Sequence, residues 1–221
     1  MKYLFANWKM YLDYDESNIL ANALANEHKK IPESVKVAVF PSALSLYPVA
    51  QVLNDVGIGV GERRHQFHET NHEVRQKLEA ALTVGLIPVL CVGETLKERE
   101  ENKTEEVIEV QLRAAFENLS WPVGRELIVA YEPVWAISKG MGASDVGLPC
   151  DEIEAERIHI LIAKMVKGIL PEVDPVVLFG GSVRKETVAG YLSQPHIHGV
   201  LVGAASTRLD SWLEIMASAI N

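Results

Sequence analysis

The stretch Tyr3-Leu4-Phe5-Ala6-Asn7-Trp8-Lys9-Met10-Tyr11 decides between the two folds that are open to this chain. Its first part, Tyr3–Trp8, is a short, almost continuous apolar run, which is typical of a parallel strand covered on both faces. In a dinucleotide-binding fold, a glycine-rich G-x-G-x-x-G turn would follow this first strand and open a helix. Here Lys9-Met10-Tyr11 follows instead. The stretch therefore favours a sheet closed into a barrel over a doubly wound sheet.

Similar apolar runs recur along the chain and are separated by segments with helical spacing. After Tyr3–Trp8, the predicted strands are Val35–Phe40, Gly57–Gly61, Ile87–Val92, Leu127–Tyr131, Val176–Phe179 and Gly199–Val202. The predicted helices are Asp15–Lys29, Ala43–Asn54, Asn71–Thr83, one opened by Asn102, one that runs through Ile158–Met165 and ends by Pro171, Lys185–Leu192 and Leu209–Ala219. Strict alternation predicts an α/β fold, a single (β/α)-barrel domain over residues 1–221. Seven units are readable, whereas a closed barrel of this kind uses eight in about 250 residues.

Composition excludes several classes of partner. The 221 residues carry a net charge of −9 and no run of basic residues, which argues against nucleic acid and against an anionic membrane surface. The N-terminal residues make a poor secretion signal, and no apolar stretch is long enough to span a bilayer. The two cysteines, Cys91 and Cys150, form no disulfide framework and no zinc motif. The sequence therefore predicts a cytoplasmic protein without a metal.

Polar residues gather where the predicted strands end, which is where barrels of this type carry their active sites. The positions are Asn7, Lys9, Glu62, Glu94, Glu132, Gly180-Gly181-Ser182 and Gly203-Ala204. A carboxylate there can act as a base, a lysine can offset negative charge, and the two small-residue turns can present backbone N–H groups to a phosphate. These residues predict a site for an anionic metabolite.

Glu132 is the strongest candidate for the base, because it ends an apolar strand and Pro133 fixes the chain direction after it. The glycine-rich segment Ser138–Gly147 has the composition of a hinged lid. Each candidate has an alternative interpretation: Glu132 as a helix cap, Lys9 as a solvated surface lysine, and Glu94 as the partner of a basic group or a cap for the next helix. His65, His68 and His72 fit one solvated helix face better than a metal site.

Six sequence strings, one of them Glu62-Arg63-Arg64, resemble the triosephosphate isomerase family, in order along the whole chain. Phe5-Ala6-Asn7-Trp8-Lys9-Met10 is similar to the family's N-W-K-M opening, and Tyr131-Glu132-Pro133-Val134-Trp135 to its catalytic-glutamate strand. Phe179-Gly180-Gly181-Ser182-Val183 and Val202-Gly203-Ala204-Ala205-Ser206 resemble its two phosphate turns, and Cys91-Val92-Gly93-Glu94 resembles a further family string.

The resemblance implies a TIM-type (β/α) barrel enzyme of glycolysis and gluconeogenesis that interconverts dihydroxyacetone phosphate and glyceraldehyde 3-phosphate, without metal or cofactor. It makes Glu132 the base that moves a proton through an enediolate. Lys9 would stabilise the negative charge with help from Glu62, and Asn7 would support the substrate side. Backbone N–H groups near Ser138, Ser182, Gly203 and Ala204 would hold the phosphate of this small phosphorylated triose.

Three departures from the family pattern bear on activity. About one strand–helix unit is missing between Phe40 and Glu62, roughly 30 residues of a typical barrel. The family's electrophilic histidine falls at Val60, which cannot donate a hydrogen bond, and Ser138 and Ala204 stand where the family has glycines. The missing stretch would hold the loop that reaches into the partner subunit, so the homodimer usual for the family is in doubt. Two functions remain open: a working isomerase, and a catalytically impaired or inactive member that binds phosphorylated metabolites.

Overall fold

The structure is a computed structural model that describes residues 1–60, 70–137 and 148–220. Its strands are β1 (Lys2–Asn7), β2 (Val35–Phe40), β3 (Gly59–Val60), β4 (Val89–Val92), β5 (Ile128–Tyr131), β6 (Val176–Phe179) and β7 (Gly199–Val202). Its α-helices are α1 (Tyr14–Glu27), α2 (Leu46–Asn54), α3 (Asn71–Thr83), α4 (Leu96–Glu100), α5 (Thr104–Phe116), α6 (Glu152–Ile169), α7 (Val188–Leu192) and α8 (Leu209–Ile220). The predicted alternation of strands and helices is confirmed.

The strands form one parallel sheet in the order β3-β2-β1-β7-β6-β5-β4. β1 pairs with β2 on one side and with β7 on the other, so that the first and last strands of the chain are neighbours, as in a barrel. The curled sheet stays open, because β3 and β4 form its two edges and do not pair with each other in the described part of the chain. The predicted (β/α) barrel with seven readable strands is confirmed; whether it closes was left open by the sequence, and the structure shows an incomplete barrel.

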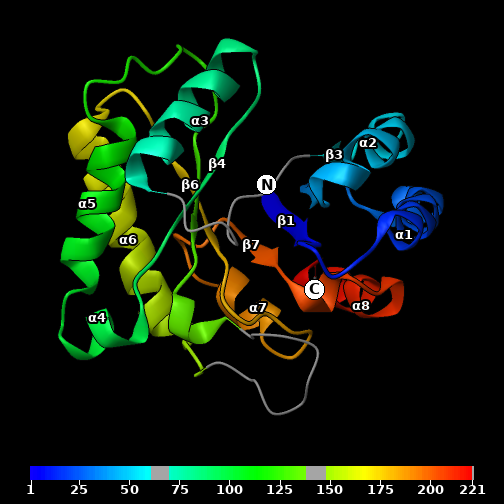
Figure 1. Cartoon of the computed structure of the whole chain (residues 1–221). Helices are drawn as coiled ribbons and strands as arrows, with labels where there is room; N and C mark the ends of the chain where they lie inside the picture. The colour runs from blue at the N-terminus through cyan, green and yellow to red at the C-terminus, as the bar shows by residue number, and fades with distance from the viewer. Residues whose placement is uncertain (61–69, 138–147, 221) are drawn as a thin grey trace.

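Alternate residues of each strand pack into two separate clusters. Residues such as Leu4 and Val129 face outward and pack against the helices, which flank the curled sheet at the left and right of Figure 1. Residues such as Tyr3, Phe5 and Ile128 fill the inside of the curl. Near the open edges the inner side chains are only partly buried, among them Phe40, Val89 and Cys91. The apolar runs are continuous in the sequence because alternate residues of each strand point to opposite faces of the sheet, and both faces are buried.

Side-chain caps begin several helices. Asp13 with Glu16, and Thr70 with Glu73, form capping boxes before α1 and α3. The prediction that Asn102 opens a helix is wrong: α5 begins at Thr104, and its N-cap Lys103 makes no side-chain cap. Asn102 has φ of +56° and follows α4 instead, the place where a left-handed residue ends a helix.

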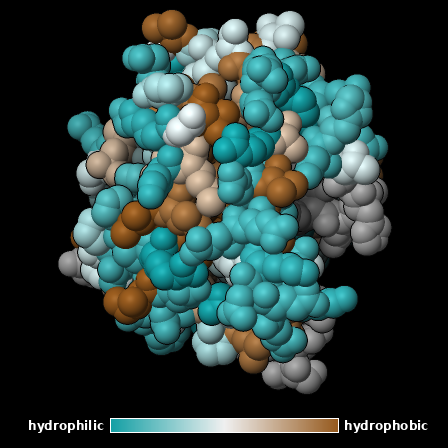
Figure 2. Space-filling view, turned by 90° about the vertical axis from the view of Figure 1, so that its left-hand side faces the viewer, coloured by the Kyte–Doolittle hydropathy of each residue, from teal (hydrophilic) through white to brown (hydrophobic). Residues whose placement is uncertain are grey.

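The short helix α4 was absent from the sequence prediction, although Thr95 and Glu98 form a capping box at its start. Three strands are shorter than predicted: β3 covers only Gly59–Val60, and β5 begins at Ile128 instead of Leu127. β4 begins at Val89, directly after Pro88, which has no N–H to give to a ladder. The outer face beside α3 and α5 is mostly hydrophilic, with separate apolar side chains (Figure 2). None of the helices in the described ranges combines the length and apolar character that a bilayer span requires.

Candidate active site

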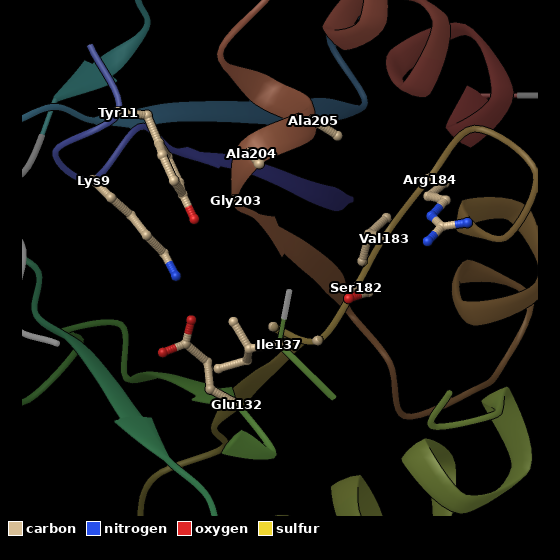
Figure 3. Close-up of a pocket in the computed structure, with 12 residues that line it drawn as sticks. Lys9, Tyr11, Glu132, Ile137, Ser182, Val183, Arg184, Gly203, Ala204 and Ala205 are labelled. Atoms are coloured by element: carbon tan, nitrogen blue, oxygen red, sulfur yellow. The ribbon is translucent and has the colours of Figure 1, made fainter. Parts of the chain in front are cut away.

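A cleft of about 200 Å³ lies at the C-terminal ends of β1, β5, β6 and β7 (Figure 3). Its lining residues are Lys9, Tyr11, Glu132, Ile137, Gly180, Gly181, Ser182, Val183, Arg184, Gly203, Ala204 and Ala205. Parallel strands whose C-terminal ends meet at one rim bring together segments that are far apart in the sequence. Five predicted site residues, Lys9, Glu132, Ser182, Gly203 and Ala204, line this one cleft.

A tight turn after β1 carries Lys9 into the cleft. The Tyr11 N–H donates to the Trp8 carbonyl at 3.1 Å, and Lys9 between them has φ of +53°. A left-handed backbone at a non-glycine residue costs about 1–2 kcal/mol, so the fold around the turn must hold it in place. Trp8, which is only 1% exposed, anchors the turn in the core. The end of the Lys9 side chain lies over Gly203, where an added Cβ would be 3.8 Å from Cε.

Glu132 is fixed at the opposite side of the cleft. It directly follows β5, is 2% exposed, and donates its backbone N–H to the Val92 carbonyl at 2.8 Å. Its side chain packs directly over Gly180, where any Cβ would overlap Glu132 Cγ, and Gly93 leaves the same kind of room for the Glu132 carbonyl. Figure 3 shows the Glu132 carboxylate and the Lys9 ammonium turned toward each other across the cleft.

Behind Glu132, the fully buried Glu94 holds the chain that continues from β5. Glu94 accepts hydrogen bonds from Tyr131 Oη at 3.2 Å and from Trp135 Nε1 at 2.8 Å. Burial, together with the neighbouring Glu94 carboxylate, raises the pKa of Tyr131, so its hydroxyl stays protonated and keeps donating. Arg99 lies 3.7 Å from Glu94 and stacks over the Trp135 ring at 4.2 Å. The interpretation of Glu94 as partner of a basic group is therefore confirmed, whereas the cap of the next helix is Thr95.

The predicted lid, Ser138–Gly147, lies outside the described residues, and so does Ser138 as a phosphate contact. The residues on either side of this segment are held together, because Leu148 N–H donates to the Trp135 carbonyl at 3.0 Å. Ser182 belongs to the same anchor: its N–H and its Oγ both donate to the Ala136 carbonyl, at 3.0 and 2.7 Å. In this structure the Ser182 N–H is thus bonded to Ala136, two positions before the predicted lid begins.

The remaining predicted residues lie elsewhere. Asn7 is 3% exposed and is not in the cleft lining, and its Oδ1 has no hydrogen-bond partner in the described part of the chain. Glu62, His65 and His68 lie outside the described residues. In the described ranges, no cluster of three or more His, Cys, Asp or Glu side chains is arranged to hold a metal ion.

Two polar side chains of the cleft were not predicted from the sequence. Tyr11 and Arg184 both line it, and their side chains come from the turns after β1 and β6 (Figure 3). Tyr11 stands two positions beyond Lys9. Its place in the cleft follows from the tight turn at Lys9, which directs both side chains to the same side. The residue types alone do not predict this turn, because lysine seldom adopts positive φ.

Comparison with known proteins agrees with this geometry. The triosephosphate isomerase family model matches residues 2–61 and 54–219, which together span nearly the whole chain. The chain belongs to the triosephosphate isomerase family. The two matched segments meet within the interval Phe40–Glu62, where the sequence predicts a missing unit.

Individual family members match over almost their full length. The triosephosphate isomerase of Protochlamydia amoebophila is 34% identical over 247 aligned positions, which cover 95% of this chain and 90% of that protein. That of Dictyoglomus thermophilum is 33% identical over 251 positions, covering 98% and 99%. Both alignments are longer than the 221 residues of this chain, so these relatives contain residues that have no counterpart here.

Proposed function

We propose that this member of the triosephosphate isomerase family interconverts dihydroxyacetone phosphate and glyceraldehyde 3-phosphate. The observation that carries the proposal is the placement of Lys9 and Glu132 on opposite sides of one cleft that is also lined by the turns after β6 and β7. A buried carboxylate can act as the base and a facing ammonium can stabilise the charge that develops, which is what proton transfer next to a carbonyl requires.

In the proposed reaction, the Glu132 carboxylate removes a proton from the carbon that bears the hydroxyl of dihydroxyacetone phosphate. The electron pair of the C–H bond forms a C=C bond, and the π pair of the carbonyl moves to its oxygen, which gives an enediolate. Lys9 stabilises this negative charge. The hydroxyl hydrogen passes from the first oxygen to the second, and Glu132 returns its proton to the neighbouring carbon while the carbonyl forms at the first carbon.

We assign the phosphate to the turns that contain Ser182, Gly203 and Ala204, with backbone N–H groups as donors. The Ser182 N–H would have to exchange its bond to Ala136 for the phosphate, which couples phosphate binding to the segment that begins after Ile137. Ser138, Glu62 and Asn7 are further proposed contacts: Ser138 for the phosphate, Glu62 for the lysine and Asn7 for the substrate side. We also propose a monomer, because the missing stretch is the one that reaches into a partner subunit.

Two substitutions test the activity. Glu132→Gln keeps the shape of the side chain and removes the base, so we expect turnover to fall by about 10²–10⁴-fold. Lys9→Met should be similarly severe, since it removes the positive charge facing the enediolate. Glu172→Gln and Lys164→Met replace exposed residues of the same types outside the cleft and should leave turnover unchanged.

Binding is measured separately from turnover. 2-Phosphoglycolate, a phosphorylated mimic of the enediolate, should stabilise the parent protein by about 2.7 kcal/mol when present at 100 times its dissociation constant. A parent protein that is stabilised in this way but shows no isomerisation above background would be an inactive binding protein. A protein with neither property would lack the proposed site altogether.

A further inference from the structure

The Tyr11 hydroxyl lies in the cleft, and the reaction steps proposed above give it no role. Tyr11 lines the cleft, and Figure 3 shows its phenolic oxygen pointing into the space between Lys9 and Gly203, on the side of the cleft that faces Glu132. The Tyr11 backbone is fixed by its hydrogen bond to Trp8, and Lys9 in the same turn has a left-handed backbone. The turn thus directs two donor side chains, Lys9 and Tyr11, into one space.

The other side-chain donors of the lining are engaged or distant. Ser182 Oγ donates to the Ala136 carbonyl at 2.7 Å. The Arg184 guanidinium lies at the end of the cleft remote from Lys9 and Glu132 (Figure 3). Among the described residues that line the cleft, Tyr11 is therefore the neutral side-chain donor nearest to the space between the base and the lysine.

The proposed chemistry needs such a group. Charge develops on one substrate oxygen when Glu132 removes a proton from carbon, and a donor already aimed at that oxygen stabilises the transition state. The isomerisation also moves the hydroxyl hydrogen from one substrate oxygen to the other. A lysine ammonium can only donate hydrogen bonds, whereas a phenol both donates and accepts.

We propose that Tyr11 is a further catalytic residue, the neutral hydrogen-bonding group at the two adjacent oxygens of the substrate. Its O–H hydrogen passes to the oxygen that carries the negative charge, while its own oxygen accepts the hydroxyl hydrogen of the other substrate oxygen. Tyr11 is neutral before and after the exchange, and atoms and charge balance without any co-reactant. The proposal rests on the proposed isomerase function and supplies the neutral donor that valine at position 60 cannot be.

The test is Tyr11→Phe, which retains the ring and its packing and removes only the hydroxyl. We expect kcat to fall by about 10²–10³-fold, as for the loss of one preorganised donor, with KM changed by less than about threefold. Inhibition by inorganic phosphate should be unchanged, because the phosphate end of the cleft is intact, whereas inhibition by 2-phosphoglycolate should weaken. Tyr14→Phe, at a tyrosine that is 54% exposed on α1, is the matched control and should match the parent protein.

Rescue separates a catalytic role from a structural one. Tyr11→His restores a neutral group that can donate and accept at pH 8, and it should recover part of the turnover that Tyr11→Phe loses, although its shape fits the site less well. Two results would overturn the proposal: a Tyr11→Phe protein with the turnover of its parent, or one in which phosphate inhibition weakens and kcat is retained, which would make Tyr11 a phosphate ligand. If the parent protein itself does not isomerise, the proposed function fails, and unchanged 2-phosphoglycolate binding in Tyr11→Phe would reject the Tyr11 contact independently.

Discussion

His159 provides the sharpest link between a buried group of this fold and its pH dependence. It lies in α6, is 0% exposed, and its ring meets Tyr131 and Phe179 edge-on or tilted, with centroids 6.0 and 6.3 Å away. Its Nδ1 lies 2.6 Å from the Ala155 carbonyl. Because burial removes water from the charged form, the pKa of His159 is lowered from 6.5 to about 4. The residue packs against β5 and β6, the strands that Glu132 and Gly180 directly follow.

The lowered pKa sets the sign and size of the effect. Above pH 6.5 the histidine is neutral in both the folded and the unfolded chain, and its full contribution to stability is present. As the pH falls from 6.5 toward 4, His159 binds a proton in the unfolded chain but not in the folded protein, so the free energy of unfolding falls. With pKa values of about 4 and 6.5, the loss between pH 7.5 and pH 4.5 is about 2.5 kcal/mol.

The assay is urea unfolding of the parent and of His159→Gln at several pH values between 7.5 and 4.5. The variant should be less stable at pH 7.5, because the core loses packing, but its free energy of unfolding should decline by about 2.5 kcal/mol less over this range. Carboxylates titrate alike in both proteins and cancel from the difference. His72→Gln, at an exposed position of α3, should follow the parent curve. Parallel curves for the parent and His159→Gln would refute the reasoning.

Two further predictions concern the cleft and the assembly. Gly180→Ala should lower kcat by about 10²-fold, because the new Cβ overlaps Glu132 Cγ and displaces the base, whereas Gly190→Ala, whose nearest neighbour would be Glu152 Cδ at 3.7 Å, should be active and no less stable. Equal kinetics for the two alanine variants would contradict this packing argument. Sedimentation at micromolar concentration should show mainly monomer, and a tight dimer would disprove the proposed monomer.

The sequence was informative wherever a residue's position follows from its place on a strand. Apolar runs located all seven strands of the described chain, and parallel strands bring their C-terminal ends to one rim. Lys9 and Glu132 could therefore be assigned to one site from sequence alone, since each follows its strand directly. Helix ends were less certain: Asn102 has the residue type of an N-cap, yet it occupies a left-handed position after α4.

The sequence by itself determined the α/β alternation, the family and the place of Lys9 and Glu132 at the rim, because these depend on local composition and order. Only the tertiary structure decided that the sheet stays open between β3 and β4, since closure requires the two edge strands to come within hydrogen-bonding distance, and the curl of the whole sheet sets that distance. It also decided that Tyr11 enters the cleft while Asn7 is buried outside its lining. The direction of a side chain beyond a strand end depends on the backbone angles of the turn, and those angles are held by contacts across the whole fold.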